Sequence, residues 1–211
     1  QGNFEKAVAE YKKALAQGSQ YILIINPDNP TGMVYPLQTL REIVAIAREF
    51  DLFVISDEIY GDIVYGDEKF IPLSHVCGDV PCIAMRGLSK EVPWPGARSG
   101  WIEFYNKERD ASFSRYAKSL VDAKMLEVCS TTLPQKVLPR IFSDARYRGH
   151  LKERNEVYKK RADIAYDIFS RVPGIVAPKP AGAFYLSAVF DEGALNDTQS
   201  LRIENPKAKH L

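Results

Sequence analysis

Three short runs of apolar residues constrain the fold of this chain more than any other feature. Residues 21–25, 52–55 and 82–85 are uninterrupted apolar runs of strand length, and each is followed by polar or turn-forming residues. Such runs are typical of strands that are buried on both faces of a parallel sheet. Apolar residues at helical spacing between positions 36 and 50 predict a helix after the first strand. The order strand, helix, strand predicts a βαβ unit, and hence an α/β fold with parallel strands and a right-handed crossover.

Further helices and strands are expected on both sides of this unit. An amphipathic helix is predicted over residues 4–17. After residue 100, strands are predicted over residues 101–105 and 183–190. Three helices are predicted between these strands, over residues 107–128, between Pro134 and Pro139, and over residues 145–172. The strand at 101–105 is a candidate antiparallel member of the sheet. The helix at 145–172 is highly charged, and we expect its charges to form a solvated face.

Composition limits the partners of the chain. Its 211 residues are 45% hydrophobic, enough for a sizeable core, and 28 basic and 27 acidic residues give a net charge of +1. This balance argues against nucleic acid or an anionic membrane and favours a small-molecule ligand. Cys77, Cys82 and Cys129 have no CxxC or Cys/His spacing, which argues against a disulfide framework or a metal site and favours a reducing, cytoplasmic location. No apolar run approaches 18 residues, and the first residues form no signal peptide.

Polar side chains that suit ligand binding follow each of the three predicted strands. Asn29 lies in the turn after the first strand, Asp57 and Tyr60 follow the second, and Ser89 and Lys90 follow the third. In open parallel sheets, ligands bind in the crevice at the carboxyl ends of the strands. Each residue alone has a structural explanation, such as a helix cap for Asp57 or a core aromatic for Tyr60. Together they serve no obvious packing purpose, and they indicate a ligand site.

Lys90 is the residue expected to carry the chemistry. It lies among small and rigid residues between two apolar runs, where partial desolvation favours the neutral, nucleophilic amine needed for a Schiff base or for proton transfer. Ser89 adds a hydroxyl, and Arg98 adds a planar fork of donors suited to phosphate. A lysine in a loop is more often a solvated surface charge, so this assignment depends on the other strand ends.

Four motifs carry a family resemblance over residues 20–190. They are Asn-Pro-Asp-Asn-Pro-Thr-Gly at 26–32, Ser-Asp-Glu-Ile-Tyr at 56–60, Ser89-Lys90 followed by Arg98 and Gly100, and Pro-Ala-Gly-Ala-Phe-Tyr at 180–185. In this order and spacing they resemble the fold type I pyridoxal-phosphate enzymes, and most closely the class I/II aminotransferases. The resemblance implies a three-layer α/β/α fold with a mostly parallel sheet. It also implies a partial large, cofactor-binding domain at residues 1–146, followed by a connecting helix and the start of a smaller α+β domain at residues 147–211.

The resemblance assigns roles to the residues at the strand ends. It implies that Lys90 holds pyridoxal 5'-phosphate as an internal aldimine and then carries a proton between the substrate Cα and the cofactor C4′. Asp57 is implied to pair with the pyridine nitrogen and keep it protonated, so that the ring accepts the electrons of the carbanion. Tyr60 and Asn29 are implied to bind the phenolic oxygen of the ring.

Ser89 and Arg98 are implied to hold the cofactor phosphate, in agreement with their chemistry. Three features of the resembled family do not occur in these residues: an upstream phosphate loop, an aromatic side chain that stacks on the cofactor, and an arginine that binds the substrate carboxylate. Arg202 lies too close to the 180–185 motif for that last role. These departures, with the lack of an initiator Met, predict that the chain is the central part of a longer enzyme.

The implied function is transfer of an amino group between an amino acid and a 2-oxo acid in two half-reactions, by a homodimer. Two alternatives stay open. A carbon–sulfur β-lyase uses the same lysine and aspartate on the same scaffold, and the sequence neither separates the two activities nor names the amino acid. A non-catalytic, aminotransferase-like effector domain of a regulator is preceded by a basic helix-turn-helix segment, and none is visible in these residues.

Overall fold

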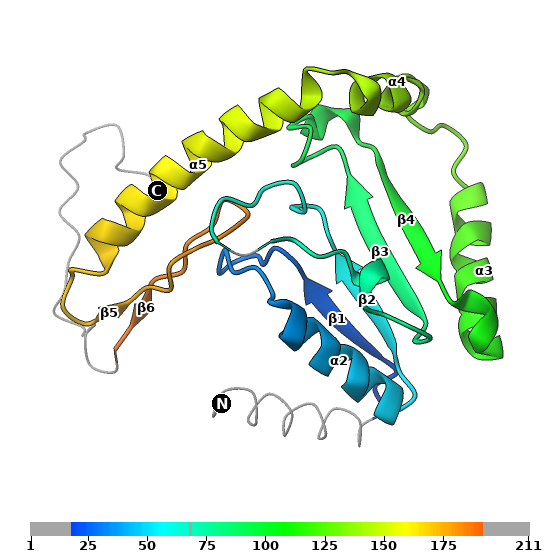
Figure 1. The fold of residues 1–211 in the computed structure, drawn as a ribbon. Helices are drawn as coiled ribbons and strands as arrows, with labels where there is room; N and C mark the ends of the chain where they lie inside the picture. Colours follow the sequence, from blue (N-terminus) through cyan, green and yellow to red (C-terminus); the bar gives the residue numbers. More distant parts are fainter. Residues whose placement is uncertain (1–17, 68, 192–211) are drawn as a thin grey trace, which may run out of the picture.

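The computed structural model describes residues 18–67 and 69–191, and its centre is a four-stranded sheet (Figure 1). The strands lie in the order β1 to β4 and cover Tyr21–Ile25, Phe53–Asp57, Cys82–Gly87 and Gly100–Tyr105. Strands β1, β2 and β3 are parallel, and β4 pairs antiparallel with β3. The predicted parallel strands of the βαβ unit and the antiparallel fourth strand are therefore confirmed.

Helices cover both faces of this sheet. Helix α2 (Leu37–Glu49) packs on one face, and its apolar stripe forms one buried cluster with the strands: Leu40, Val44, Ala47, Ile22, Ile24 and Val54. Side chains alternate along a strand, so Phe53 points to the opposite face from Val54. There Phe53 contacts Phe113 of helix α3 (Ala111–Met125), with ring centroids 5.1 Å apart. The result is the expected three-layer α/β/α arrangement.

The prediction that residues 21–25 are buried on both faces is wrong. The side chains that face α2 are buried, but Tyr21 and Leu23 on the other face are 48% and 53% exposed. Helix α3 reaches this face near Phe53, and in the described part of the chain it leaves Leu23 uncovered. An apolar run predicts a strand, but the elements that cover each face are set by distant parts of the chain.

The helices after β4 begin and end at identifiable residues. Residues 107–109 form a short 3₁₀ helix, and α3 begins only at residue 111 because the Asp110 side chain accepts a hydrogen bond from Phe113 N. Helix α4 (Thr132–Ser143) is longer than predicted and contains both prolines of its segment. Helix α5 (Tyr147–Phe169) agrees with the predicted charged helix. Among residues 18–67 and 69–191, no helix is long and apolar enough to cross a membrane.

The strand predicted over residues 183–190 is mostly wrong. Only Val189–Phe190 (β6) is a strand, and it pairs antiparallel with Ile175–Val176 (β5). At the start of this range, Ala183 N instead donates to the Ile63 carbonyl oxygen in a distant loop. Figure 1 shows α5 running from the α4 end of the molecule to these two short strands. The predicted helix at 4–17 and the polar tail from residue 192, with Arg202, lie outside the described residues.

The 26–32 turn and the 180–185 motif, far apart in sequence, pack directly against each other at Gly32. Two backbone N–H groups of the motif donate to the Gly32 carbonyl oxygen at 2.8 and 2.9 Å. Gly32 has a φ of +72°, and a Cβ at this position would lie 2.4 Å from the Tyr185 carbonyl oxygen. Glycine is therefore required both for the backbone conformation and for the close approach of the two segments.

Gly32→Ala is expected to lower the free energy of unfolding by about 2–3 kcal/mol, because it adds backbone strain and a clash with the Tyr185 carbonyl. Gly149 on α5 is a matched control, since it is exposed and a Cβ added there would meet no atom within 4 Å. Gly149→Ala is expected to be neutral or to stabilise by up to about 1 kcal/mol. Urea unfolding of both variants measures the difference, and wild-type stability in Gly32→Ala would contradict this view of the turn.

Candidate active site

Backbone hydrogen bonds hold the carboxyl ends of the three parallel strands side by side. Asn26 N donates to the Asp57 carbonyl oxygen at 2.9 Å, and Glu58 N donates to the Met85 carbonyl oxygen at 2.9 Å. Lys90 follows in the turn directly after β3. The three strand ends therefore meet at one edge of the sheet, as the sequence predicts.

Tyr60 is buried at this edge and is the centre of a polar cluster. Its hydroxyl oxygen lies 2.7 Å from that of Tyr185. Burial, Tyr185 and the Asp57 carboxylate raise the pKa of Tyr60, and a hydrogen bond from the Asn29 side chain opposes this shift. The raised pKa keeps the phenol protonated, so it is a hydrogen-bond donor at neutral pH. The structure thus brings Asn29, Asp57 and Tyr60 together.

Lys90 joins this cluster through an aromatic side chain. It is half-buried, and its Nζ lies 5.4 Å from the centre of the Phe184 ring, within the range of a cation–π contact. The Phe184 ring packs edge-to-face on Tyr60, with centroids 5.3 Å apart. Phe184 and Tyr185 were not among the predicted site residues, although both lie in the 180–185 motif. Their position within that motif was the signal available in the sequence.

Ser89 and Arg98 are less closely connected to the cluster. Ser89 is half-buried beside Lys90, whereas Arg98 is exposed, and its Nη1 donates to the Pro95 carbonyl oxygen at 2.9 Å. The described contacts therefore connect the amine, carboxylate, phenol and amide of the predicted site, whereas the contact described for the Arg98 guanidinium is with the Pro95 backbone.

This set of groups suits a ligand with a carbonyl group and an aromatic ring. The Lys90 amine is able to attack a carbonyl carbon and form a Schiff base. The Tyr60 phenol and the Asn29 amide are able to donate hydrogen bonds to a neighbouring oxygen. The Asp57 carboxylate is able to pair with a protonated ring nitrogen. The chemistry available at this edge is therefore that of carbonyl compounds and amines.

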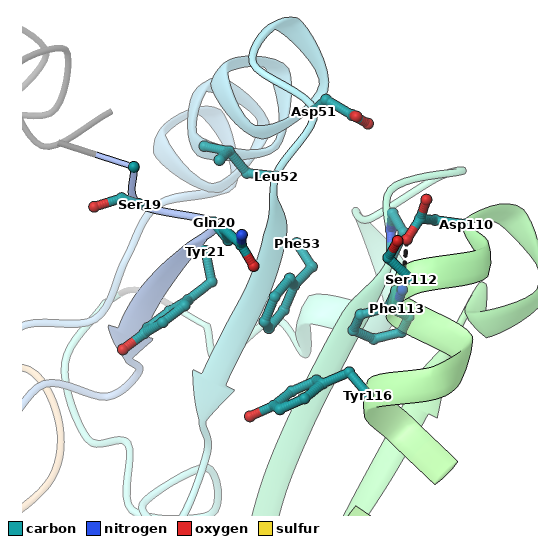
Figure 2. A pocket seen from close by; sticks show the side chains of 12 residues that line it. Ser19, Gln20, Tyr21, Asp51, Leu52, Phe53, Asp110, Ser112, Phe113 and Tyr116 are labelled. Carbon is teal, nitrogen blue, oxygen red and sulfur yellow. Dashed lines mark hydrogen bonds between the residues drawn. The ribbon is translucent and has the colours of Figure 1, made fainter. Parts of the chain in front are cut away.

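A cavity lies elsewhere in the structure (Figure 2). It has a volume of about 600 Å³, and the aromatic rings of Tyr21, Phe53, Phe113 and Tyr116 surround it. Tyr21 and Phe53 are the first residues of β1 and β2, so this cavity is at the amino ends of the parallel strands. Because Lys90 lies at their carboxyl ends, the cavity is not the predicted site.

A buried carboxylate directly after Lys90 was not predicted from the sequence. Glu91 is 1% exposed, and its Oε1 accepts hydrogen bonds from Arg86 Nη2 at 2.9 Å and from Asp62 N at 3.0 Å. The Arg86 guanidinium reaches it from β3, and Asp62 reaches it from the loop after β2. The only signal in the sequence was an acidic residue beside the lysine, and nothing local indicated that it is buried.

Burial changes the protonation of this carboxyl group. It raises the pKa of Glu91 to about 7, and the nearby Asp62 carboxylate adds to the shift, whereas the Arg86 guanidinium opposes it. Burial disfavours the charged form of an acid, so the carboxyl group is partly protonated near neutral pH. The ionisation state of a group next to Lys90 therefore changes within the physiological range.

The raised pKa predicts that the protein loses stability as pH rises. Unfolding returns the pKa of Glu91 to about its ordinary value of 4.5, so between pH 4.5 and 7 the folded state binds more protons than the unfolded state. This difference corresponds to about 3 kcal/mol, which is available below pH 4.5 and lost above pH 7. Glu91→Gln is expected to remove this part of the pH dependence. The free energy of unfolding, measured with urea at pH 5 and at pH 8, tests this, and the exposed Glu153→Gln is the control. If the free energy of unfolding changes equally between the two pH values in wild type and in Glu91→Gln, the assignment is contradicted.

Comparison with known proteins identifies relatives along nearly the whole chain. The model of the family "Aminotransferase class I and II" matches residues 1–204. An uncharacterised aminotransferase of Methanocaldococcus jannaschii is 50% identical over 190 residues, which are 90% of this chain and 44% of the relative. Tyrosine aminotransferase of Caenorhabditis elegans is 36% identical over 165 residues, 78% of this chain and 35% of the relative.

A solved structure agrees with these relatives. The alanine aminotransferase from Pyrococcus furiosus matches with a TM-score of 0.70 and 37% sequence identity, over 80% of this chain and 42% of that one. The chain spans less than half the length of these relatives. The family model matches almost every residue, and a lysine, a carboxylate and a phenol lie at the strand ends. We conclude that the chain belongs to the class I and II aminotransferase family.

Proposed function

We propose that the full-length protein is a pyridoxal-phosphate-dependent aminotransferase that moves an amino group between an amino acid and a 2-oxo acid. The observation that carries the proposal is the meeting of Lys90 with Asn29, Asp57 and Tyr60 at one sheet edge. Family membership supports the reaction class. The named relatives act on alanine and on tyrosine, so both amino acids are candidate substrates.

The donors at this edge fit pyridoxal phosphate. When bound, the cofactor supplies an aldehyde and a ring that accepts electrons. Asp57 would hold the ring nitrogen, while Tyr60 and Asn29 would donate to the phenolic oxygen. Ser89 and Arg98 would hold the phosphate, and the exposed Arg98 guanidinium would exchange its present Pro95 carbonyl partner for a phosphate oxygen.

Lys90 would have two tasks in the reaction. Its amine would bind the cofactor covalently, and, once released by the incoming amino acid, would move a proton at the substrate Cα. The Phe184 ring beside Nζ shields the amine from water on one side. Tyr60 stays protonated throughout, since its raised pKa makes the phenolate unfavourable at neutral pH.

We also infer the organisation of the whole protein. Helix α5 begins at Tyr147, which supports a large domain over residues 1–146 and the start of a small domain over 147–211. Met125, Leu126, Val128 and Leu133 are each at least 70% exposed, which supports a homodimer that covers them. The three cysteines are free, which supports a reducing cytoplasmic location. Sedimentation of the full-length protein tests the dimer.

Amino-transfer assays test the proposed activity. The full-length protein, loaded with pyridoxal phosphate, is incubated with alanine or tyrosine and with 2-oxoglutarate, and formation of glutamate is measured. Cysteine is tested in parallel for release of pyruvate, ammonia and sulfide. Glutamate formation well above sulfide release is the expected result. Dominant sulfide release would replace the proposal with a carbon–sulfur β-lyase, and no reaction at all would favour a non-catalytic binding domain.

A further inference from the structure

Helix α5 holds the backbone next to Lys90. Arg154 on this helix donates through Nη1 to the Glu91 carbonyl oxygen, and through Nη2 to the Asp62 carbonyl oxygen at 2.9 Å. Asn155 adds hydrogen bonds to the same Asp62 carbonyl, at 2.8 Å, and to the Val64 carbonyl, at 3.1 Å. These two residues differ from their charged neighbours on α5, which are exposed as the sequence predicts.

The same helix reaches Lys90 by a second route. Tyr158, one turn after Arg154, packs against the Phe184 ring with centroids 5.9 Å apart. Phe184 in turn lies under Lys90 Nζ at 5.4 Å. Helix α5 therefore contacts both the backbone after Lys90 and the aromatic ring beneath its amine.

On its other side, the segment after Lys90 is fixed to the sheet. The Glu91 side chain accepts a hydrogen bond from Arg86 on β3 at 2.9 Å, and Leu88 N donates to the carbonyl oxygen of Ser99, the residue before β4, at 3.1 Å. Residues 88–94, the Lys90 segment, are thus held between β3 and α5. The segment meets the helix directly through Arg154 and, by way of the Phe184 ring, through Tyr158.

The partners of Arg154 are unusual for a half-buried cation. Burial lowers its pKa, and its two shortest hydrogen bonds go to backbone carbonyls. In the described ranges it forms no ion pair with a carboxylate. The Asp62 and Glu91 carboxylates nearby favour the charged form of Arg154, but its hydrogen bonds go to the backbone carbonyls of these two residues, so the contact holds their backbone in place. Its geometry does suit one purpose: one planar fork joins two loops, after β2 and β3, to one helix.

We propose that Arg154 is a positioning residue for Lys90: through the carbonyl of Glu91 it fixes the Lys90 segment to α5, so that helix and lysine move as one unit. The proposal rests on the proposed function only for the role of Lys90. The position of the amine affects the reaction rate even when it shifts by a fraction of an ångström, because the amine must attack a carbonyl carbon and later move a proton at the substrate Cα. Helix α5 is the element that leads from the sheet to the 180–185 motif, so its orientation is passed directly to the amine.

Hydrogen–deuterium exchange tests the positioning role in the cofactor-free, full-length protein. Arg154→Met keeps the apolar stem of the side chain but removes its donors. We expect about tenfold faster exchange in the Lys90 segment, with unchanged exchange in β2 and β3, because only the brace to α5 is lost. Arg148→Met, an exposed arginine earlier on the same helix, is the matched control and is expected to exchange like wild type.

A second readout follows the lysine itself. After pyridoxal phosphate is added, the rate at which it becomes covalently attached is measured from the visible absorbance. Arg154→Met is expected to slow attachment about tenfold, and Arg148→Met is expected to leave it unchanged. In the double variant Arg154→Met/Glu91→Gln, the fold-decrease in the rate of attachment is expected to be smaller than the product of the fold-decreases in the two single variants. Both residues hold the same stretch of backbone, so their effects overlap.

Two results would overturn the proposal. One is wild-type exchange in the Lys90 segment of Arg154→Met; the other is faster exchange spread evenly over the whole sheet, which indicates a general loss of stability. If Arg154→Met does not fold, Arg154→Lys, which keeps the charge but not the fork, must still exchange faster than wild type in this segment. Failure of wild type to attach the cofactor would contradict the proposed function instead, and the exchange comparison would still decide the role of Arg154.

Discussion

Lys90→Ala is expected to reduce amino-group transfer by at least about 10³-fold. The substitution removes both the amine that binds the cofactor and the group that moves the proton at the substrate Cα, and proton transfer alone contributes roughly 10²–10⁴-fold. The fold should be retained, because Lys90 lies in a turn and is only half-buried. The substitution removes the contact between its amine and the face of the Phe184 ring. Initial rates of glutamate formation with saturating cofactor measure the effect.

Lys152→Ala is the matched control for this substitution. Lys152 is exposed on α5, and its replacement should leave wild-type activity. Unfolding curves of both variants separate a loss of chemistry from a loss of structure. A Lys90→Ala variant within tenfold of wild type, with its fold intact, would show that another group performs both tasks and would remove Lys90 from the mechanism.

Asp57→Asn is expected to reduce amino-group transfer by about 10²–10³-fold while leaving the fold intact. Asn keeps the size of the side chain and an oxygen that accepts the hydrogen bond from Ile59 N, which is 3.1 Å from Asp57 Oδ1. It loses the charge that would keep a ring nitrogen protonated, and removal of one such electrostatic partner commonly costs this much. The measurement is the maximal rate at saturating substrate and cofactor.

Asp51→Asn is a suitable control for the charge change. Asp51 is exposed and lies two residues before the start of β2, whereas Asp57 is its last residue. Asp51 has a φ of +53°, a conformation that Asn tolerates well. This variant should transfer amino groups at the wild-type rate. If Asp57→Asn also does so, the carboxylate does not act on the cofactor ring.

The edge of the sheet was predictable because its signals are local. An apolar run of strand length followed by turn-forming residues locates a strand end, and parallel pairing then places Asp57 and Lys90 at the same edge. The motif at 180–185 was recognised in the sequence, but its backbone conformation was not. A strand was predicted to begin at Ala183, yet the N–H groups of residues 181–183 donate to Gly32 and Ile63, which are far away in the chain.

The remaining features depend on contacts between distant segments. Leu23 was expected to be buried, and whether it is covered depends on which helices reach that face. Arg154 was interpreted as part of a solvated face, since its neighbours in sequence are charged and exposed. Its carbonyl partners lie in the loops after β2 and β3. Periodicity within a helix reports which side is apolar, but it does not report which polar residue meets a carbonyl from another element.

The Lys90 amine is, in the proposed mechanism, the covalent attachment point of the cofactor. The most direct measurement is to add pyridoxal phosphate to the full-length protein, reduce with borohydride, digest, and locate the modified peptide by mass spectrometry. We predict one reduced cofactor group on Lys90, none on Lys152, and none on the Lys90 segment of Lys90→Ala. Attachment spread over several exposed lysines, or no attachment at Lys90, would contradict the proposed mechanism.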